Sequence, residues 1–312
     1  RRRSAAKKTA VIQPPRLHPG DVIRVVAPSG PVPREAFLAG VDVLKERYDV
    51  RYDEGIFTRD GYLAGPDERR LAELKAALAD PEARAVYMAR GGYGLMRILP
   101  FLDAVEFARQ PRVLVGFSDG TALLSFAAHA GVTAIHGPVI SQLGNLPVAD
   151  HRALFHLLDE PNPGVVLGGL EALIPGRAQG RLLGGNLEVF SRLVGTPYLP
   201  DLAGAILFFE DLGERPYRVD RLITYLDLAG VFDKVSAVVV GDFSSCLEPE
   251  ATRADSPTVN EVLLERLGRL PIPVALGATV GHGSRNTAIP FGALVELDTR
   301  HETLTALEGA VR

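Results

Sequence analysis

A serine stands at the centre of residues 116–120, where glycine, one residue, serine, one residue and glycine follow one another. The apolar run 113–115 precedes this segment, and residues 121–130 after it have a helical pattern. Strand, sharp turn and helix in this order are typical of a nucleophile elbow, which exposes the serine hydroxyl and leaves the next backbone N–H free to bind an oxyanion. In a chain with 32 glycines the pattern alone is a weak signal, so Ser118 needs chemical partners elsewhere.

A serine hydroxyl becomes a good nucleophile when a base, usually a histidine, removes its proton. Two of the seven histidines follow apolar strands: His136 comes after 132–135 and His282 after 274–277. Ligand-facing groups collect at the ends of parallel strands, so these two are the candidates. The other five histidines are expected to be surface or structural residues: His18, His129, His151, His156 and His301.

Glu210 is the best candidate for a carboxylate that orients the base. It closes the strand 205–210, whose other residues are all apolar. A charge at the mouth of a buried strand is costly unless it is paired or faces a cleft. Asp211 and Glu214 are expected to be solvated or capping groups. The chain order of serine, glutamate and histidine is that of the α/β-hydrolases, although triads occur in several orders on unrelated folds.

Three of the four residues 91–94 are glycines, directly after the expected strand 85–89. Such glycines let a backbone approach a ligand and direct its N–H groups at an anion, so this segment is a candidate oxyanion hole. A tight turn and a phosphate loop are the alternatives, and neither common nucleotide-binding glycine pattern matches. In the similar segment 184–186, Asn186 is expected to cap a helix that begins at Leu187.

Apolar strands alternate with amphipathic helices through the first half of the chain, which predicts an α/β fold with a doubly wound, mostly parallel sheet. Its expected strands are 22–27, 85–89, 113–116 and 132–135, and its expected helices are 34–48, 67–79 and 121–130. The second half is richer in strands and predicts a smaller, barrel-like α/β domain. Its expected strands are 165–167, 180–183, 205–210, 236–241, 274–277, 294–297 and 303–307, and its expected helices are 187–194, 219–229 and 259–267.

A length of 312 residues favours two domains. We expect a disordered basic tail at 1–15, a domain with the serine at 16–160, a linker at 161–178, and a domain with Glu210 and His282 at 179–312. The net charge of −4 argues against a nucleic-acid or membrane-surface binder. A single cysteine, Cys246, is expected to be partly buried and favours a reducing compartment. No apolar run approaches the ~18 residues of a membrane helix, so a soluble protein is expected.

Six short motifs in order carry a resemblance to a known family. They are RGGYG at 90–94, GFSDGT at 116–121, HGP at 136–138, GGN at 184–186, FED at 209–211 and GHG at 281–283. From about residue 16 to 307 the chain resembles the LD-carboxypeptidases, serine peptidases that include the microcin-immunity peptidases. The resemblance implies that Ser118 is the nucleophile, His282 the general base and Glu210 the carboxylate that orients it. It implies an oxyanion hole made by the backbone N–H groups of Gly92 and Asp119.

The resemblance also implies a setting for the reaction. The site would lie in the cleft between two domains, often in a homodimer, and would need no metal or cofactor. Typical members act in the bacterial cytoplasm on recycled cell-wall peptides and remove the terminal D-alanine of a muropeptide tetrapeptide. The free carboxylate of such a substrate suits a guanidinium group, and Arg90 and Arg285 are candidates by their proximity to the motifs. Each is equally compatible with a surface charge or a structural ion pair.

Two other functions stay open. A microcin-immunity peptidase cleaves a peptidyl or aminoacyl nucleotide, and the resemblance suggests a longer loop between nucleophile and carboxylate, with an aromatic residue that stacks on the base. This chain has no tryptophan and a compact interval between Ser118 and Glu210, which ranks that function second. A non-catalytic protein would instead hold a small anion in the glycine turns, with Ser118 merely capping a helix.

Overall fold

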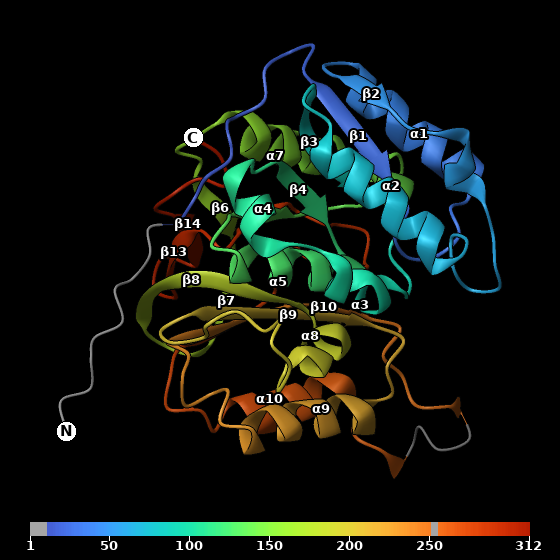
Figure 1. The fold of residues 1–312 in the computed structure, drawn as a ribbon. Coiled ribbons are helices and arrows are strands. Elements are labelled where there is room, and N and C mark those ends of the chain that lie inside the picture. Colours follow the sequence, from blue (N-terminus) through green and yellow to red (C-terminus); the bar gives the residue numbers. More distant parts are fainter. Residues whose placement is uncertain (1–10, 251–254) are drawn as a thin grey trace, which may run out of the picture.

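The computed structural model describes residues 11–250 and 255–312, which form two β-sheets with helices between and around them (Figure 1). In this part of the chain the first sheet has six strands in the order β12-β5-β4-β3-β1-β2. Neighbouring strands are parallel except for β12, which is antiparallel to β5, so the predicted doubly wound, mostly parallel sheet is confirmed. The strands are β1 (Val22–Val26), β2 (Asp49–Arg51), β3 (Ala83–Met88), β4 (Val113–Gly116), β5 (Ala134–His136) and β12 (Ile289–Phe291).

Helices cover both faces of the first sheet because successive side chains of a strand point to opposite faces. Val86 and Met88 of β3 belong to one core cluster, together with residues of α2, α4 and α5. Ala85 and Tyr87 of the same strand belong to a second cluster, together with residues of α1, α6 and α7. The helices are α1 (Arg34–Lys45), α2 (Asp67–Ala79), α4 (Ala104–Arg109), α5 (Thr121–His129), α6 (Ile140–Leu143) and α7 (Val148–Asp159).

The second sheet has eight described strands in the order β6-β14-β13-β8-β9-β10-β11-β7. Its central strands β8, β9, β10 and β11 are parallel, and its margins are antiparallel. The edge strands β6 and β7 are separated in the chain by residues 169 and 170 alone, so the two margins of the sheet lie close together, as expected for a barrel-like domain. The strands are β6 (Gly164–Gly168), β7 (Glu171–Ile174), β8 (Arg177–Asn186), β9 (Ile206–Leu212), β10 (Ala237–Ser244), β11 (Val274–Leu276), β13 (Leu294–Asp298) and β14 (Thr303–Ala306).

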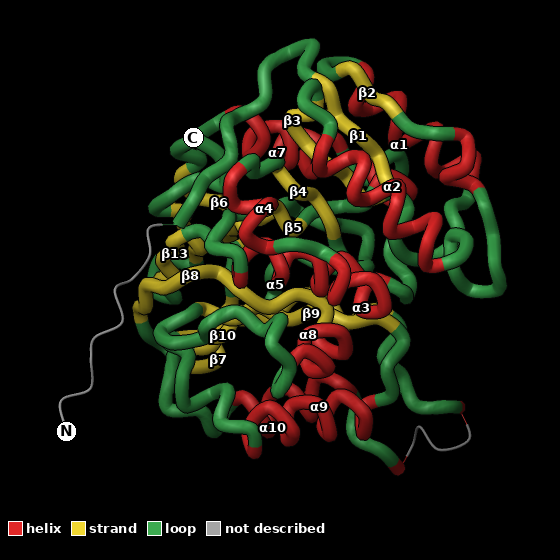
Figure 2. Tube along the Cα trace, in the orientation of Figure 1, coloured by secondary structure: helices red, strands yellow, loops and turns green. Residues whose placement is uncertain are grey.

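Helix α5 lies between the two sheets, and three further helices cover the far face of the second sheet (Figures 1 and 2). These are α8 (Leu187–Leu193), α9 (Pro216–Leu228) and α10 (Val259–Leu267). Phe126 of α5 and Phe208 of β9 belong to one continuous hydrophobic core. This shared core positions the carboxyl ends of β4 and β9, where Ser118 and Glu210 lie, relative to each other.

Two expectations about the domain boundaries differ from the structure. The segment 161–178, predicted as a linker, contains β6 and β7, which pair with β14 and β11 in the second sheet. The chain also returns to the first sheet through β12, so residues 179–312 do not form a domain confined to the second sheet. The sequence had indicated a strand at 165–167 within this segment, whereas β7 and β12, with four and three residues and a proline beside or within them, are too short for a period of two to show in the sequence.

The expected basic tail is only partly described, since residues 1–10 lie outside the described residues. The described part is bound to the first domain: the Ile12 N–H donates to Gly131 O at 2.8 Å, and the Thr133 N–H donates to Ile12 O at 3.0 Å. Within the described residues, no helix combines the length and the apolar character needed to cross a membrane.

Candidate active site

Ser118 occupies a strained turn between β4 and α5. Its φ of 62° lies in the left-handed region, which costs a residue with a side chain about 1–2 kcal/mol. The two flanking glycines leave room for the Met88 side chain, because a Cβ on Gly116 or on Gly120 would lie 2.7 Å from the Met88 sulfur. The predicted nucleophile elbow is therefore present, with the strand, the turn Ser118–Gly120 and the helix in the expected order.

The glycine segment 91–94 lies directly against the elbow. A Cβ on Gly91 would be 2.6 Å from the Ser118 Cβ and 2.8 Å from its Oγ, so only glycine permits this approach. Gly92 and Gly94 have φ values of 109° and 134°, which residues with side chains rarely adopt. The segment thus brings its backbone close to the side chain of the serine.

Replacing Gly91 by alanine is expected to lower activity by about 10²-fold, because a displacement near 1 Å of a reacting group has an effect of that size. The new methyl group must push Ser118 or the glycine segment aside. Gly168→Ala is a matched control, since a Cβ at that position meets no atom within 4 Å. Steady-state kinetics on both purified variants test the prediction, and equal activity of the two would contradict it.

His282 and Glu210 form a hydrogen-bonded pair, as the sequence predicted. The imidazole Nδ1 lies 2.7 Å from Glu210 Oε2; the histidine side chain is 16% exposed and the glutamate fully buried. A carboxylate only accepts hydrogen bonds, so Nδ1 carries the proton and Nε2 is left as the basic nitrogen. Burial raises the pKa of Glu210, and its hydrogen bond with His282 opposes that rise. The His282 ring also packs on Phe117, the neighbour of Ser118, with 4.2 Å between ring centroids.

The loop that carries His282 is tied to the first domain. Gly281 accepts a hydrogen bond from the Gln142 side chain, and its N–H donates to Asn286 Oδ1 at 3.1 Å. Arg285 forms a bidentate ion pair with the buried Asp150, at 2.7 and 2.9 Å. Arg285 is therefore held in a structural ion pair, and it does not line the cavity described below.

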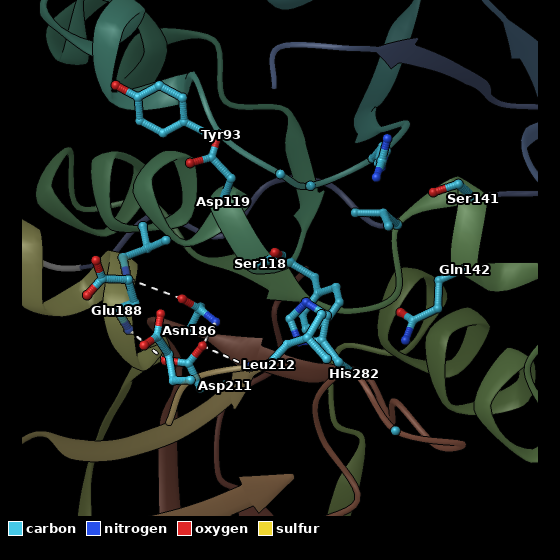
Figure 3. Close-up of a pocket in the computed structure, with 18 of the residues that line it drawn as sticks. Tyr93, Ser118, Asp119, Ser141, Gln142, Asn186, Glu188, Asp211, Leu212 and His282 are labelled. Atoms are coloured by element: carbon cyan, nitrogen blue, oxygen red, sulfur yellow. Dashed lines mark hydrogen bonds between the residues drawn. The ribbon is translucent and has the colours of Figure 1, made fainter. Parts of the chain in front are cut away.

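Ser118 and His282 line one cavity of about 1130 Å³, to which both halves of the chain contribute (Figure 3). The first half supplies Arg90, Gly92 and Tyr93, and the second half supplies Asn186 and Asp211. This arrangement resembles that of hydrolases that act through a nucleophile, a base and an orienting carboxylate.

Two polar residues in the cavity wall, Asn186 and Asp211, make more hydrogen bonds than the sequence indicated. Asn186 caps α8 as predicted, accepting from the Val189 N–H, and its side-chain amide also donates to Asp211 at 3.0 Å. Asp211 was expected to be solvated or capping, and it caps: it is 3% exposed and accepts the Glu188 N–H at the start of α8. Burial raises the pKa of Asp211 to about 7. The FED motif drew attention to Glu210. The burial of Asp211, the next residue, is visible only in the three-dimensional structure.

The other histidine candidate, His136, is excluded from the pair. It is fully buried between Phe117 and Phe208, and neither ring nitrogen has a hydrogen-bond partner in the described residues. Burial, together with the charge of His282, lowers its pKa to about 3, so it is neutral. Cys246 is buried as expected, and burial raises its thiol pKa to about 12.

Comparisons with known proteins agree with the fold and the cavity. The family models for the LD-carboxypeptidase N-terminal and C-terminal domains match residues 23–137 and 179–297. A Synechocystis protein named as a carboxypeptidase is 38% identical over 95% of this chain and 97% of its own, and the murein tetrapeptide carboxypeptidase of Pseudomonas aeruginosa is 32% identical over 88% and 92%. The chain belongs to the LD-carboxypeptidase family.

Solved structures give the same fold. The muramoyltetrapeptide carboxypeptidase of Oxalobacter formigenes superposes with a TM-score of 0.81 at 30% identity, over 91% of this chain and 97% of the other. The microcin C7 self-immunity protein MccF, in complex with aspartyl sulfamoyl adenosine, superposes with a TM-score of 0.88 at 24% identity, over 96% and 100%. The family to which this chain belongs thus has relatives named as muramoyltetrapeptide carboxypeptidases and relatives named as microcin self-immunity proteins.

Proposed function

We propose that the protein is a serine LD-carboxypeptidase that removes the terminal D-alanine from muropeptide tetrapeptides. The observation that carries the proposal is the buried Glu210–His282 pair beside a strained elbow serine in one large cavity. The names of the Pseudomonas and Oxalobacter relatives support the substrate class. The proposal includes the setting that the resemblance implies, a homodimer that takes part in murein recycling in the cytoplasm.

The proposed reaction begins when Ser118 Oγ attacks the amide carbonyl that joins an L-configured diamino acid centre to D-alanine. His282 Nε2 takes the serine proton, and the carbonyl oxygen becomes an oxyanion that the N–H groups of Gly92 and Asp119 bind. The C–N bond then breaks, and His282 returns the proton to the leaving amine. Water, deprotonated by His282, hydrolyses the acyl-enzyme and restores Ser118.

Arg90 is the proposed partner of the substrate carboxylate. It lines the cavity next to Gly91 and Gly92, and its guanidinium donates to the Pro31 carbonyl. Arg192, another arginine of the wall, is already paired with Glu188 at 2.8 Å. Arg90 therefore retains N–H donors for a second, anionic partner.

Replacing Arg90 by alanine is expected to raise KM about 10- to 100-fold, the worth of a charge-assisted hydrogen bond of about 1.5–3 kcal/mol. The kcat is expected to change much less, since the carboxylate is bound in ground state and transition state alike. Kinetics with the tetrapeptide and with its C-terminal amide measure this directly. If KM of the variant rises as much for the C-terminal amide as for the tetrapeptide acid, Arg90 does not bind the substrate carboxylate.

The function itself is tested by mass spectrometry of L-Ala-D-Glu-meso-diaminopimelate-D-Ala after incubation with the protein. Release of D-alanine supports the proposal. An aminoacyl sulfamoyl adenosine, the ligand class named for MccF, is the parallel substrate. Cleavage of that compound alone would favour the microcin-immunity function. If neither is cut and a fluorophosphonate fails to label Ser118, the non-catalytic, anion-binding function remains.

A further inference from the structure

The side chain of Asp119, the residue after the elbow serine, is buried in a position that the proposed reaction does not use. It is 2% exposed, and one oxygen, Oδ2, accepts two hydrogen bonds: from Ser29 Oγ at 2.6 Å and from the Leu95 N–H at 2.9 Å. A carboxylate inside a protein is costly, so these contacts must be specific to be retained. Its pKa is raised to about 6 by burial, against the hydrogen bonds and the charge of Arg70, so it is ionised at neutral pH.

Both partners of Asp119 are attached to the glycine segment. Leu95 directly follows Gly94, and Ser29 precedes Gly30, whose N–H donates to Gly91 O at 3.0 Å. The carboxylate therefore holds the C-terminal end of the segment through its hydrogen bond with Leu95. It holds the N-terminal end indirectly, because it binds Ser29 and the neighbouring Gly30 binds Gly91.

Arg70 also holds the backbone next to the glycine segment. Its side chain is fully buried on α2 and donates to the carbonyls of Pro28 and Gly94. The same two stretches of backbone are therefore held by a carboxylate from the elbow and by a guanidinium from α2.

A glycine-rich segment cannot hold its own conformation. Gly91, Gly92 and Gly94 have no side chains to pack, and Tyr93 is 48% exposed. Glycines lose the most conformational freedom on folding, so the direction of the Gly92 N–H must be imposed by neighbouring groups. The Asp119 side chain accepts a hydrogen bond from Leu95, which directly follows this segment, and the Asp119 backbone N–H is the second proposed donor.

We propose that the Asp119 carboxylate is a positioning residue that fixes the Gly91–Gly94 segment against the elbow, so that the N–H groups of Gly92 and Asp119 converge on one oxyanion. This inference rests on the proposed function and extends it. The ligand chemistry is a tetrahedral, negatively charged intermediate. The position of the donors matters most in the transition state, so the effect belongs in kcat rather than in KM.

Three variants test the proposal. Asp119→Ala removes both contacts, Asp119→Asn keeps a carbonyl acceptor, and Ser29→Ala removes one donor and leaves the contact to Leu95. Asp103→Asn is the matched control, because Asp103 also accepts backbone N–H groups at a helix start, Val105 and Glu106, but does not line the cavity. For each variant, kcat, KM, the melting temperature and the second-order rate of fluorophosphonate labelling are measured.

Asp119→Ala is expected to lose about 10²–10³-fold in kcat, the effect of losing one oxyanion donor, with KM changed less than about threefold. The labelling rate is expected to fall in parallel, because the phosphoryl oxygen occupies the same site. In Asp119→Asn and Ser29→Ala, kcat and the labelling rate are expected to fall less. In Asp103→Asn both are expected to equal the wild-type values.

Two results would overturn the inference: folded Asp119 and Ser29 variants with wild-type kcat and labelling rate, or a loss in KM alone. If Asp119→Ala does not fold, Asp119→Asn and Ser29→Ala decide. A wild type that is labelled but cuts no tetrapeptide removes the proposed substrate, while the labelling rates still test Asp119. A wild type that is neither active nor labelled rejects both.

Discussion

Replacing Ser118 by alanine is expected to lower kcat for D-alanine release by about 10⁴–10⁶-fold, the range found when the nucleophile of a triad is removed. The Ser118→Ala protein cannot form an acyl-enzyme, and any remaining rate comes from substrate binding and the oxyanion donors alone. KM is expected to stay within a few fold, since the cavity is unchanged. Mass-spectrometric detection of D-alanine measures the loss, with Ser236→Ala, remote from the cavity, as the control.

Ser118→Gly separates chemistry from stability at the same position. Glycine tolerates the φ of 62° that Ser118 adopts, so this variant is expected to be inactive yet to gain about 1 kcal/mol of unfolding free energy over Ser118→Ala. Denaturant unfolding of the two variants checks the difference. An inactive variant that is also unfolded would not support a nucleophilic role, and an active Ser118→Ala would rule it out.

Glu210→Gln is expected to lower kcat by about 10⁴-fold with little change in KM, the effect seen when the carboxylate of a triad becomes an amide. The amide nitrogen can donate to His282 Nδ1, which then holds the proton on Nε2, where it blocks the base. Because Glu210 is fully buried and 2.7 Å from the imidazole, no water can replace its contact without rearrangement. The size of the substituted side chain is preserved, so the fold is expected to survive.

The matched control for this prediction is Glu296→Gln, which changes a carboxylate of the second sheet that pairs with Arg177 outside the cavity. Kinetics, melting temperature and fluorophosphonate labelling are compared for both. Labelling of Glu210→Gln is expected to slow strongly, because the hydroxyl loses its base. Activity within tenfold of wild type in a folded Glu210→Gln protein would reject the role given to this carboxylate.

Features that depend on neighbours within a few residues could be predicted from the amino-acid sequence alone. The elbow around Ser118, the cap at Asn186 and helices such as α2 and α10 follow from glycine positions, capping chemistry and apolar periodicity. The ends of apolar strands also singled out Glu210 and the two candidate histidines, because ligand-facing groups collect there. The family motifs in order were enough to identify the family, which the comparisons confirm.

Which of these groups contact one another could not be predicted from the sequence and depends on the tertiary fold. It pairs His282 with Glu210, 72 positions away, and leaves His136 alone in an apolar pocket. It joins Arg285 to Asp150 across 135 positions and returns the chain to the first sheet through β12. Such contacts join residues far apart in the sequence and depend on how sheets and helices pack. The local periodicity of the sequence does not predict them. Burial then sets the chemistry, since the same imidazole is a base beside a carboxylate and an inert ring among phenylalanines.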